Sequence, residues 1–424
     1  MLIEFSVSNF RSFRERQTFQ MTAAPRLGKK VNTFPAGASG EKLPDLLKVA
    51  AIYGSNASGK SSFIHALGMI ERLATRKPDA TTRDIPVRPF RFDRALLDEP
   101  STFEMHFVVH GLRYQFLVGA TQNRIMNEAL YTYPKGKEAL LYSRRHVSGS
   151  DEYIFGETFE GGDVLRDAWR RMTGPQSLFI SQAVANSSED LRQLRNPFEW
   201  LTEGLFVIDD PAQLSFMGEK VHATENKNLS AGICTFLQQI DVPVTSIHWE
   251  PDKDAGTEVA APKSSEEVDQ YSKFKRKGKT TLTHETRLGS ADFDISEESS
   301  GTRNLIGFWV PSVMLTSSHQ GASIRYRVVV VDELDASLHP EAVEHLVQMH
   351  LESGAMTQLI FTTHDTHLMS TKLLRRDQLW ITDRDSNGAT NLMSIHSFKG
   401  REGEDVEKRY FEGRYRGLPI RRSK

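Results

Sequence analysis

The chain has 424 residues, with 53 lysines and arginines against 55 aspartates and glutamates, which gives a formal net charge of −2. This near-neutral balance excludes a protein that coats nucleic acid by bulk charge alone, although it allows a local basic patch. Cys234, the single cysteine, cannot form an internal disulfide, and no apolar run approaches the ~18 residues needed to span a bilayer. We therefore expect a cytoplasmic protein with no membrane association, built of two or three domains or of one large α/β domain that carries insertions.

The first third of the chain is predicted to be mainly β-structure. Over residues 3–7 apolar and polar side chains alternate, as in a half-buried strand and unlike a signal peptide. Residues 47–53 form an apolar strand that leads through a glycine-rich turn into an amphipathic helix. Between 86 and 155 the period of two returns, with turns that indicate antiparallel hairpins. Residues 1–160 are thus expected to form the first half of a split α/β domain, including an antiparallel β subdomain.

The middle of the chain is predicted to be helical and then polar. Apolar residues at helical spacing, such as Leu165, Trp169 and Met172, indicate a helical insertion over residues 161–245. The polar stretch that follows contains a dense group of bases, namely Lys273, Lys275, Arg276, Lys277 and Lys279. These bases are expected either to form a solvated loop or to contact a phosphate backbone, and the sequence leaves both interpretations open.

The last third returns to strands that alternate with helices. Residues 328–331 are four valines, which is typical of a strand buried on both faces. Pro340 opens an amphipathic helix, and the apolar segments 359–363 and 378–382 indicate further strands. Strand, helix and strand joined by short links predict a parallel sheet. We therefore assign the chain to the α/β class, with residues 246–424 as the second half of the split domain.

Residues Gly54–Ser61 match the pattern G-x-x-x-x-G-K-[ST]. An apolar strand precedes the match and an amphipathic helix follows it, which is the context that a phosphate-binding P-loop requires. The backbone N–H groups of such a loop point at phosphate, Lys60 would reach the β- and γ-phosphates, and Ser61 would coordinate Mg²⁺. The pattern predicts ATP and Mg²⁺ as ligands, with nucleotide contacts at Gly54, Asn56, Gly59, Lys60, Ser61 and Ser62.

Two carboxylates follow the four valines, at the end of a strand where α/β sheets bind ligands. Asp332 is placed to hold the Mg²⁺ shell, and Glu333 is placed to orient and polarise the attacking water. The alternative is an acidic strand end that merely meets solvent, and the P-loop upstream argues against it. The pair therefore predicts hydrolysis of ATP, with Glu333 as the catalytic base.

Four shorter features separate the classes of P-loop protein. Ser300 and Gly301 lie at a helix start, where small residues form an anion site without a lysine. Asp335 comes two residues after Glu333, and His364 follows a strand, where a neutral imidazole could contact a γ-phosphate or the attacking water. Arg11 ends the first strand within the sequence Asn-Phe-Arg-Ser-Phe. Each feature is weak by itself, but their order and spacing reinforce one another.

Together these motifs resemble those of the ABC-type ATPase superfamily, in particular the heads of RecF, SMC-like and overcoming-lysogenisation-defect proteins. The resemblance implies a P-loop NTPase fold with a mixed core sheet. It also implies that Ser300 and Gly301 of one subunit cap the nucleotide held by the P-loop of another. Asp335 would belong to the D-loop, His364 would be the switch histidine, and Arg11 would lie near the nucleotide. The minimum assembly is then a homodimer, and larger rings of dimers stay open.

The run Tyr410–Tyr415, with Pro419 after it, is similar to the end of RloA-like ATPases, the subgroup that includes the ATPase of the PARIS phage-defence system. This resemblance implies a sensor or switch that controls a separately encoded nuclease of the TOPRIM type, with nucleic acid or a phage protein as further partners. Two features depart from the pattern. Thr302 and Arg303 stand where the signature has glycine and glutamine, and Gln182 is our candidate for the Q-loop glutamine and a metal ligand.

Three other functions stay open from the sequence. The segment Asp383–Asp385 resembles the metal-binding D-x-D of TOPRIM nucleases, although too few residues follow it for such a domain. A RecF-like clamp in DNA repair would use the basic residues at 273–279 and after 399 to bind duplex DNA. A P-loop scaffold would bind the nucleotide without hydrolysing it.

Overall fold

The computed structural model describes residues 1–77, 84–187, 191–221, 227–251, 278–316, 328–370, 372–400 and 404–418. They divide into two compact units. The first unit comprises Met1–Asp209, Met314–Asp335 and Leu346–Lys424, and the second comprises Asp210–Val313 and Ala336–His345. The P-loop segment and the two acids after the four valines therefore belong to the same unit.

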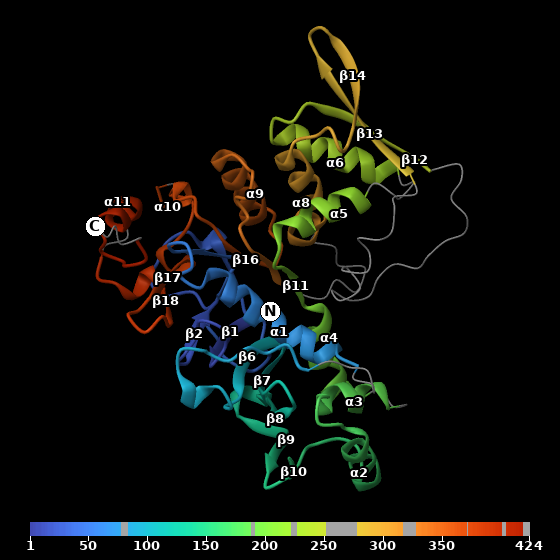
Figure 1. Ribbon diagram of the computed structural model, residues 1–424, viewed down its shortest axis with the longest axis vertical. Coiled ribbons are helices and arrows are strands. Elements are labelled where there is room, and N and C mark those ends of the chain that lie inside the picture. The colour runs from blue at the N-terminus through green and yellow to red at the C-terminus, as the bar shows by residue number, and fades with distance from the viewer. Residues whose placement is uncertain are drawn as a thin grey trace. The chain divides into compact units, whose positions relative to one another are not determined.

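A mixed six-stranded sheet forms the centre of the first unit (Figure 1). Its strands, in order across the sheet, are β11 (Leu205–Ile208), β15 (Val328–Val331), β16 (Gln358–Thr362), β5 (Val49–Tyr53), β17 (Leu379–Arg384) and β18 (Thr390–Ser394). Neighbouring strands are parallel except for β17 and β18, which are antiparallel. All residues of β5, β15 and β16 are buried, as expected for central strands covered on both faces.

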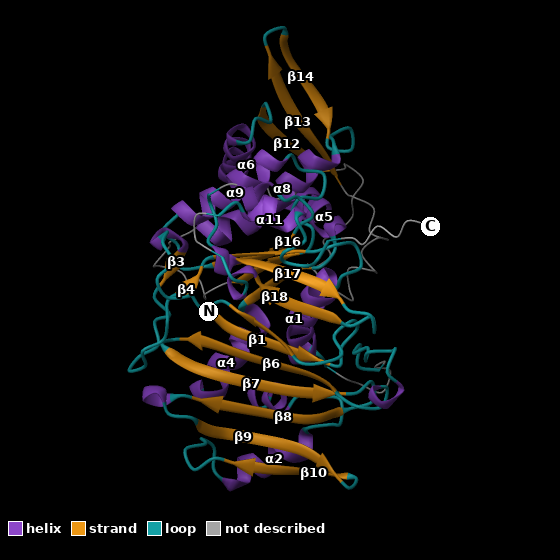
Figure 2. Ribbon diagram, turned by 90° about the vertical axis from the view of Figure 1, so that its left-hand side faces the viewer, coloured by secondary structure: helices purple, strands orange, loops and turns teal. Residues whose placement is uncertain are grey.

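The second large sheet of this unit is antiparallel throughout (Figure 2). Its strands, in order, are β10 (Ser150–Phe155), β9 (Ala139–Val147), β8 (Ile125–Thr132), β7 (Leu112–Ala120), β6 (Ser101–Val109), β1 (Leu2–Ser8) and β2 (Gln17–Gln20). Phe103, Met105 and Phe107 of β6 are fully buried on one face, in agreement with the period of two in the sequence. The short strands β3 (Thr33–Phe34) and β4 (Leu46–Leu47) pair separately.

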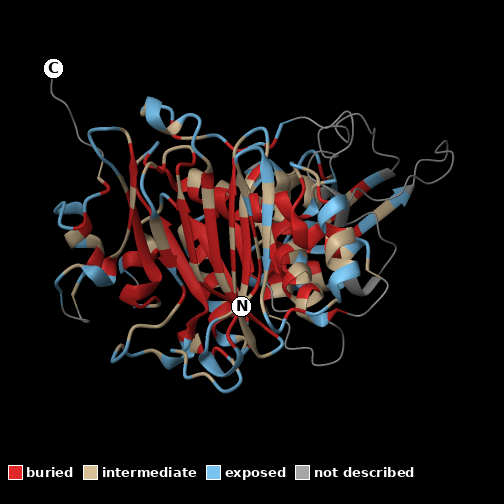
Figure 3. Ribbon diagram, turned by 90° about the horizontal axis from the view of Figure 1, so that it is seen from below, coloured by how far each residue is buried: buried red, intermediate tan, exposed pale blue. Residues whose placement is uncertain are grey.

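Helix α1 (Lys60–Thr75) carries the P-loop lysine as its first residue and packs against the helices that follow the antiparallel sheet. Its apolar face, with Phe63, Leu67 and Ile70, is fully buried, as the helical spacing predicts. Figure 3 shows the buried strands and helices of this core in red. The other helices are α2 (Asp163–Met172), α3 (Phe179–Ala185), α4 (Arg192–Glu203), α10 (His367–Ser370) and α11 (Val406–Phe411), with short 3-10 helices at Lys30–Asn32, Arg94–Leu96, Pro134–Gly136, Arg376–Gln378 and Ile395–Ser397.

The α/β class, the mixed core sheet and the antiparallel β subdomain expected from the sequence are thus confirmed. The compact units, however, have different boundaries from the three ranges 1–160, 161–245 and 246–424. The helices between 163 and 203 belong to the first unit, because the chain returns to its central sheet as strand β11, which pairs in parallel with β15. The sequence pattern did not predict β11, because four apolar residues between two helices do not reveal a strand.

The second unit contains helices α5 (Pro211–Val221), α6 (Lys227–Gln239) and most of α8 (Ser300–Thr316). It also contains a three-stranded antiparallel sheet, β12 (Val244–Pro251), β13 (Gly278–Thr286) and β14 (Gly289–Asp294). Helix α9 (Pro340–Glu352) begins in the second unit and ends in the first. Of the predicted basic group only Lys279 is described, as part of β13, because residues 273–277 lie outside the described residues, as does Pro419.

No helix in the described part of the chain is both long enough and apolar enough to cross a membrane.

Candidate nucleotide-binding site

The P-loop connects the end of β5 to the start of α1, and two of its glycines are required by the backbone. Gly54 has φ 150° and Gly59 has φ 112°, both in the region that side chains disfavour. A Cβ atom at Gly54 would also collide with the hydroxyl of Thr382, and one at Gly59 with the hydroxyl of Thr390. The loop is therefore built against the β17–β18 hairpin, which leaves no room for larger residues at these positions.

Lys60 lies over this loop. Its Nζ atom donates to the carbonyl oxygens of Gly54, at 2.8 Å, and Ser55, at 3.2 Å. Burial lowers the pKa of Lys60, whereas the nearby carboxylates of Asp332, Glu333 and Asp335 act in the opposite direction. A cation that is held at the mouth of the loop and faces these acids is suited to bind phosphate together with Mg²⁺.

The other predicted contacts of the loop lie around Lys60. Ser61 and Ser62 are half-buried in the first turn of α1, and Asn56 is exposed at the tip of the loop. Hydroxyl and carboxylate oxygens are the ligands that Mg²⁺ prefers. Ser61 and the carboxylate of Asp332 therefore fit the donor set of a magnesium ion that also binds nucleotide phosphates.

The two acids after β15 have different environments. Asp332 is only 4% exposed, and its Oδ1 atom accepts a hydrogen bond from the hydroxyl of Thr362. Glu333 has φ 51°, and its side chain is 45% exposed. The buried carboxylate is thus fixed by the neighbouring strand, while the exposed one can meet a water molecule.

The segment after β16 faces these acids. Nε2 of His364 lies 3.9 Å from Oε1 of Glu333. Asp335 connects the two segments, because its Oδ2 atom accepts the backbone N–H groups of His364 and Asp365, each at 3.2 Å. The structure therefore brings Lys60 together with Asp332, Glu333, Asp335 and His364 at the carboxyl ends of adjacent parallel strands.

Arg11 lies in a tight turn beside the P-loop. The turn is closed by backbone hydrogen bonds between Phe10 and Phe13, and the N–H group of Arg11 donates to the carbonyl of Arg88 at 2.7 Å. The next residue, Ser12, accepts the backbone N–H of Thr390, the residue that a side chain at Gly59 would meet. Burial, together with the charges of Arg88 and Arg72, lowers the pKa of the Arg11 guanidinium, whereas the carboxylate of Asp209 acts in the opposite direction.

Ser300 and Gly301 belong to the second unit, where they begin α8. A Cβ atom at Gly301 would collide with the carbonyl oxygen of Ser337, and Asn304 donates to the carbonyl oxygen of Ala336 at 3.0 Å. The start of α8 thus packs closely against the segment that follows Asp335. Ser300 and Gly301 thus belong to a different unit from the P-loop of their own chain.

The structure places Gln182 away from the predicted metal site. Gln182 is part of α3, and its neighbour Ser181 donates to the carbonyl of Ala74, near the C-terminal end of α1. Ser61 lies at the opposite end of this 16-residue helix, roughly 20 Å away at 1.5 Å per residue. The buried carboxylate of Glu128 anchors α3 there by accepting the N–H groups of Phe179 and Ile180. Gln182 is therefore not retained as a magnesium ligand.

The D-x-D segment also has a structural explanation. Oδ1 of Asp385 accepts the backbone N–H groups of Asn387 and Ala389, which shapes the turn between β17 and β18. In the described part of the chain, no three His, Cys, Asp or Glu side chains gather as a metal-binding group of their own. The nuclease alternative thus finds no support in this segment.

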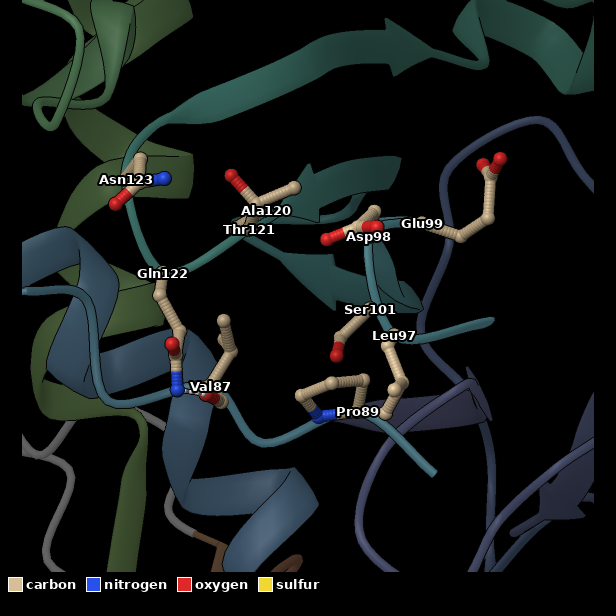
Figure 4. Close-up of a pocket in the computed structure, with 10 residues that line it drawn as sticks. All are labelled: Val87, Pro89, Leu97, Asp98, Glu99, Ser101, Ala120, Thr121, Gln122 and Asn123. Carbon is tan, nitrogen blue, oxygen red and sulfur yellow. Dashed lines mark hydrogen bonds between the residues drawn. The ribbon is translucent and has the colours of Figure 1, made fainter. Parts of the chain in front are cut away.

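A pocket of about 270 Å³ lies elsewhere in the first unit, and Figure 4 shows the residues that line it. It is lined by residues of the segments 87–89, 97–101 and 120–123. None of the P-loop residues and neither of the two acids after β15 contributes to it. This pocket is therefore separate from the candidate nucleotide-binding site.

Thr362 also belongs to this site, although the sequence pattern predicts it only as part of an apolar strand. The signal that could have found it is a hydroxyl residue two positions before the predicted switch histidine, at the end of a strand next to the acids. The predicted motifs follow three neighbouring strands of the sheet. The P-loop follows β5, the acids follow β15 and the histidine follows β16, with β16 between the other two strands.

The chain matches a family of proteins that have an AAA domain. The model of a protein family described as "AAA domain, putative AbiEii toxin, Type IV TA system" matches residues 49–370, which is more than half of the chain. A comparison with curated proteins gave no match.

Among solved structures, the chain is similar to the SMC head domain from Thermotoga maritima, with 14% identity and a TM-score of 0.41, over 93% of this chain and 98% of that chain. It is also similar to an SMC head domain with an extended coiled coil, bound to the C-terminal domain of ScpA from Pyrococcus furiosus. That match has 12% identity and a TM-score of 0.39, and covers 93% of this chain and 96% of the other.

Proposed function

Because the chain belongs to the family of AAA domains described as putative AbiEii toxins of type IV TA systems, we propose that it binds and hydrolyses ATP in the presence of Mg²⁺. The observation that carries this proposal is the convergence of Lys60, Asp332, Glu333 and His364 at the ends of three neighbouring strands. A scaffold that only binds a nucleotide would need Lys60. It would not need the solvent-exposed pair of Glu333 and His364.

Each residue has a distinct role in this proposal. The P-loop backbone and Lys60 bind the phosphates, and Ser61 and Asp332 hold the magnesium ion, which neutralises phosphate charge when bound. Glu333 accepts a proton from the attacking water, because its carboxylate is exposed and directed by the left-handed backbone. His364 contacts the same water or the γ-phosphate, and Arg11 supplies a cation beside the P-loop.

Two subunits would be needed for a complete site. Ser300 and Gly301 lie in the other unit from the P-loop, which is compatible with their capping a nucleotide that is bound to a second copy of the chain. Two copies closing over two Mg·ATP molecules would act as a switch, since ATP then favours the closed state and hydrolysis releases it. Support for this step comes from the motif resemblance, which extends from Arg11 to His364.

The switch would control a separate effector. The resemblance of the C-terminal run to RloA-like ATPases suggests a TOPRIM-type nuclease as the partner and anti-phage defence as the setting. The family description, which names a putative toxin of a type IV TA system, is in keeping with such a setting. A nuclease encoded beside this chain should co-purify with it and cleave DNA in an ATP-dependent manner. The alternative of a DNA-repair clamp has no specific observation in its favour, since residues 273–277 lie outside the described residues.

Release of phosphate from ATP by the purified chain tests the proposed activity. The wild-type protein should hydrolyse ATP with Mg²⁺ and stop when EDTA removes the metal. Lys60→Ala should lose nucleotide binding and turnover, whereas Lys30→Ala, which changes an exposed lysine, should leave both unchanged. A wild-type protein that binds Mg·ATP but releases no phosphate would leave the scaffold function in place of the ATPase.

A further inference from the structure

We propose that Thr362 is a positioning residue that sets the geometry of both acids, so that one buried hydroxyl supports magnesium binding and water activation together. The inference rests on the proposed ATPase function and extends it to a residue outside the P-loop, the acids and the histidine. Thr362 is the last residue of β16 and is 0% exposed. Its strand lies between β15, which carries the acids, and β5, which carries the P-loop.

The hydrogen bonds of this hydroxyl have a fixed direction. The backbone N–H of Glu333 can only donate, and it donates to Oγ1 of Thr362 at 2.8 Å. The single proton of that hydroxyl is therefore free for the carboxylate of Asp332, whose Oδ1 atom accepts it at 2.5 Å. One side-chain oxygen thus contacts both acids, and a hydrogen bond to a carboxylate is among the stronger kinds.

The same strand end also holds the unusual backbone of Glu333. A φ of 51° is uncommon for a residue with a side chain, and the surrounding structure has to maintain it. Two bonds do so from β16, namely the Glu333 N–H bond to the Thr362 hydroxyl and the Leu334 N–H bond to the Thr362 carbonyl oxygen at 3.1 Å. The resulting turn places the Glu333 carboxylate on the exposed side, near His364.

A side chain of the segment after β15 also accepts hydrogen bonds from the backbone of the segment after β16. Asp335, two residues after Glu333, accepts the N–H groups of His364 and Asp365, which follow Thr362 in the chain. Hydrogen bonds therefore connect the segment of the two acids to the segment of the histidine. Thr362 makes those that involve the buried Asp332 and the backbone of Glu333. Removal of its hydroxyl leaves the Glu333 N–H and one oxygen of Asp332 without their partners, and an unpaired oxygen is costly on a carboxylate as buried as that of Asp332.

The test compares Thr362→Val, which keeps the shape but removes the hydroxyl, with Thr362→Ser, which keeps the hydroxyl. Thr357→Val is the matched control, because Thr357 is also buried, lies just before β16 and donates only to the carbonyl of Leu315, at 2.6 Å. For Thr362→Val we expect kcat to fall about tenfold or more and the Mg²⁺ concentration for half-maximal activity to rise several-fold. The KM for ATP should change far less, since the P-loop is untouched.

The Thr362→Ser variant should retain most of the wild-type kcat and magnesium dependence, and Thr357→Val should match the wild type even if its Tm falls. The inference is overturned if Thr362→Val, folded to the same extent by circular dichroism, has the kcat and magnesium dependence of Thr357→Val. It is also overturned if Thr362→Ser is as impaired as Thr362→Val. A wild-type protein without ATPase activity would instead contradict the proposed function, and Mg²⁺-dependent binding of ATP to the same variants would then test whether Thr362 positions Asp332.

Discussion

Nε2 of His364 lies 3.9 Å from Oε1 of Glu333, and both side chains are open to solvent at 41% and 45% exposure. Asp332, the residue before Glu333, is almost completely buried. The two consecutive carboxylates thus have opposite environments. That of Asp332 is buried in the protein, whereas that of Glu333 is exposed to solvent and faces His364. This difference is the structural basis for assigning metal binding to Asp332 and water activation to Glu333.

Replacing His364 with alanine should lower kcat for ATP hydrolysis by about tenfold to a hundredfold, because the group facing Glu333 and the attacking water is lost. The KM for ATP should change little, since Lys60 and the P-loop remain. Steady-state phosphate release measures both quantities. His396→Ala, which removes an exposed histidine on a 3-10 helix, is the control and should behave as the wild type. Equal kcat values for the two variants would remove His364 from the mechanism.

Gly59→Ala should abolish nucleotide binding and destabilise the fold. The new Cβ atom would meet the hydroxyl of Thr390, and the φ of 112° is strained for alanine. Gly162→Ala provides the comparison, because nothing lies within 4 Å of its added Cβ atom. Isothermal titration with Mg·ATP and thermal unfolding should separate the two variants. Wild-type affinity in Gly59→Ala would show that the loop does not bind phosphate in the described conformation.

Stability should depend on pH through Glu71 of α1. Burial raises the pKa of this carboxyl from 4.5 to about 7, so the folded protein binds more protons than the unfolded chain between these values. The free energy of unfolding should therefore decrease as the pH rises from 4.5 to 7. Glu71→Gln should remove this loss and be more stable than the wild type at pH 8 by about 1–3 kcal/mol, with little difference at pH 4.5.

Urea unfolding at both pH values measures this effect. The control is Glu15→Gln, because the side chain of Glu15 is 78% exposed. If the wild type and Glu71→Gln lose stability in parallel between pH 4.5 and 8, the carboxyl of Glu71 is ionised in the folded protein and the assignment is wrong.

A site shared between two copies predicts recovery of activity in a mixture of inactive variants. Lys60→Ala lacks a working P-loop, and Ser300→Arg blocks the signature, so each should be inactive alone. A mixed dimer contains one site with both parts intact, and an equimolar mixture should regain up to about a quarter of the wild-type activity. A mixture that stays inactive, under conditions where the copies exchange, would indicate that Ser300 does not act on the partner's nucleotide.

Local patterns were sufficient to predict the P-loop and the strand with two acids. The residues from Gly54 to Ser61 are consecutive, and their strand and helix are visible in the same stretch of sequence. The parallel arrangement followed from alternating strands and helices, because that pattern leaves few ways to bury both faces of a sheet. The P-loop and the strand with two acids are formed by residues that are neighbours in the sequence, and for this reason the sequence predicts them.

Contacts between distant segments account for what the sequence could not reveal. Strand β11 is recognisable only by its pairing with β15, more than a hundred residues later. Gln182 was chosen for its position before a helical region, but Glu128 and Ala74 anchor its helix at the far end of α1. The role of Thr362 depends on hydrogen bonds to two residues about thirty positions earlier in the chain.

The proposal that this site hydrolyses ATP is tested most directly by comparing Glu333→Gln with the wild type in two assays, equilibrium binding of Mg·ATP and release of phosphate. The substitution keeps the size and hydrogen-bonding capacity of the side chain but removes the base. We predict that Glu333→Gln binds ATP as tightly as the wild type and releases phosphate at least about a hundredfold more slowly. Phosphate release by Glu333→Gln at the wild-type rate would contradict the account.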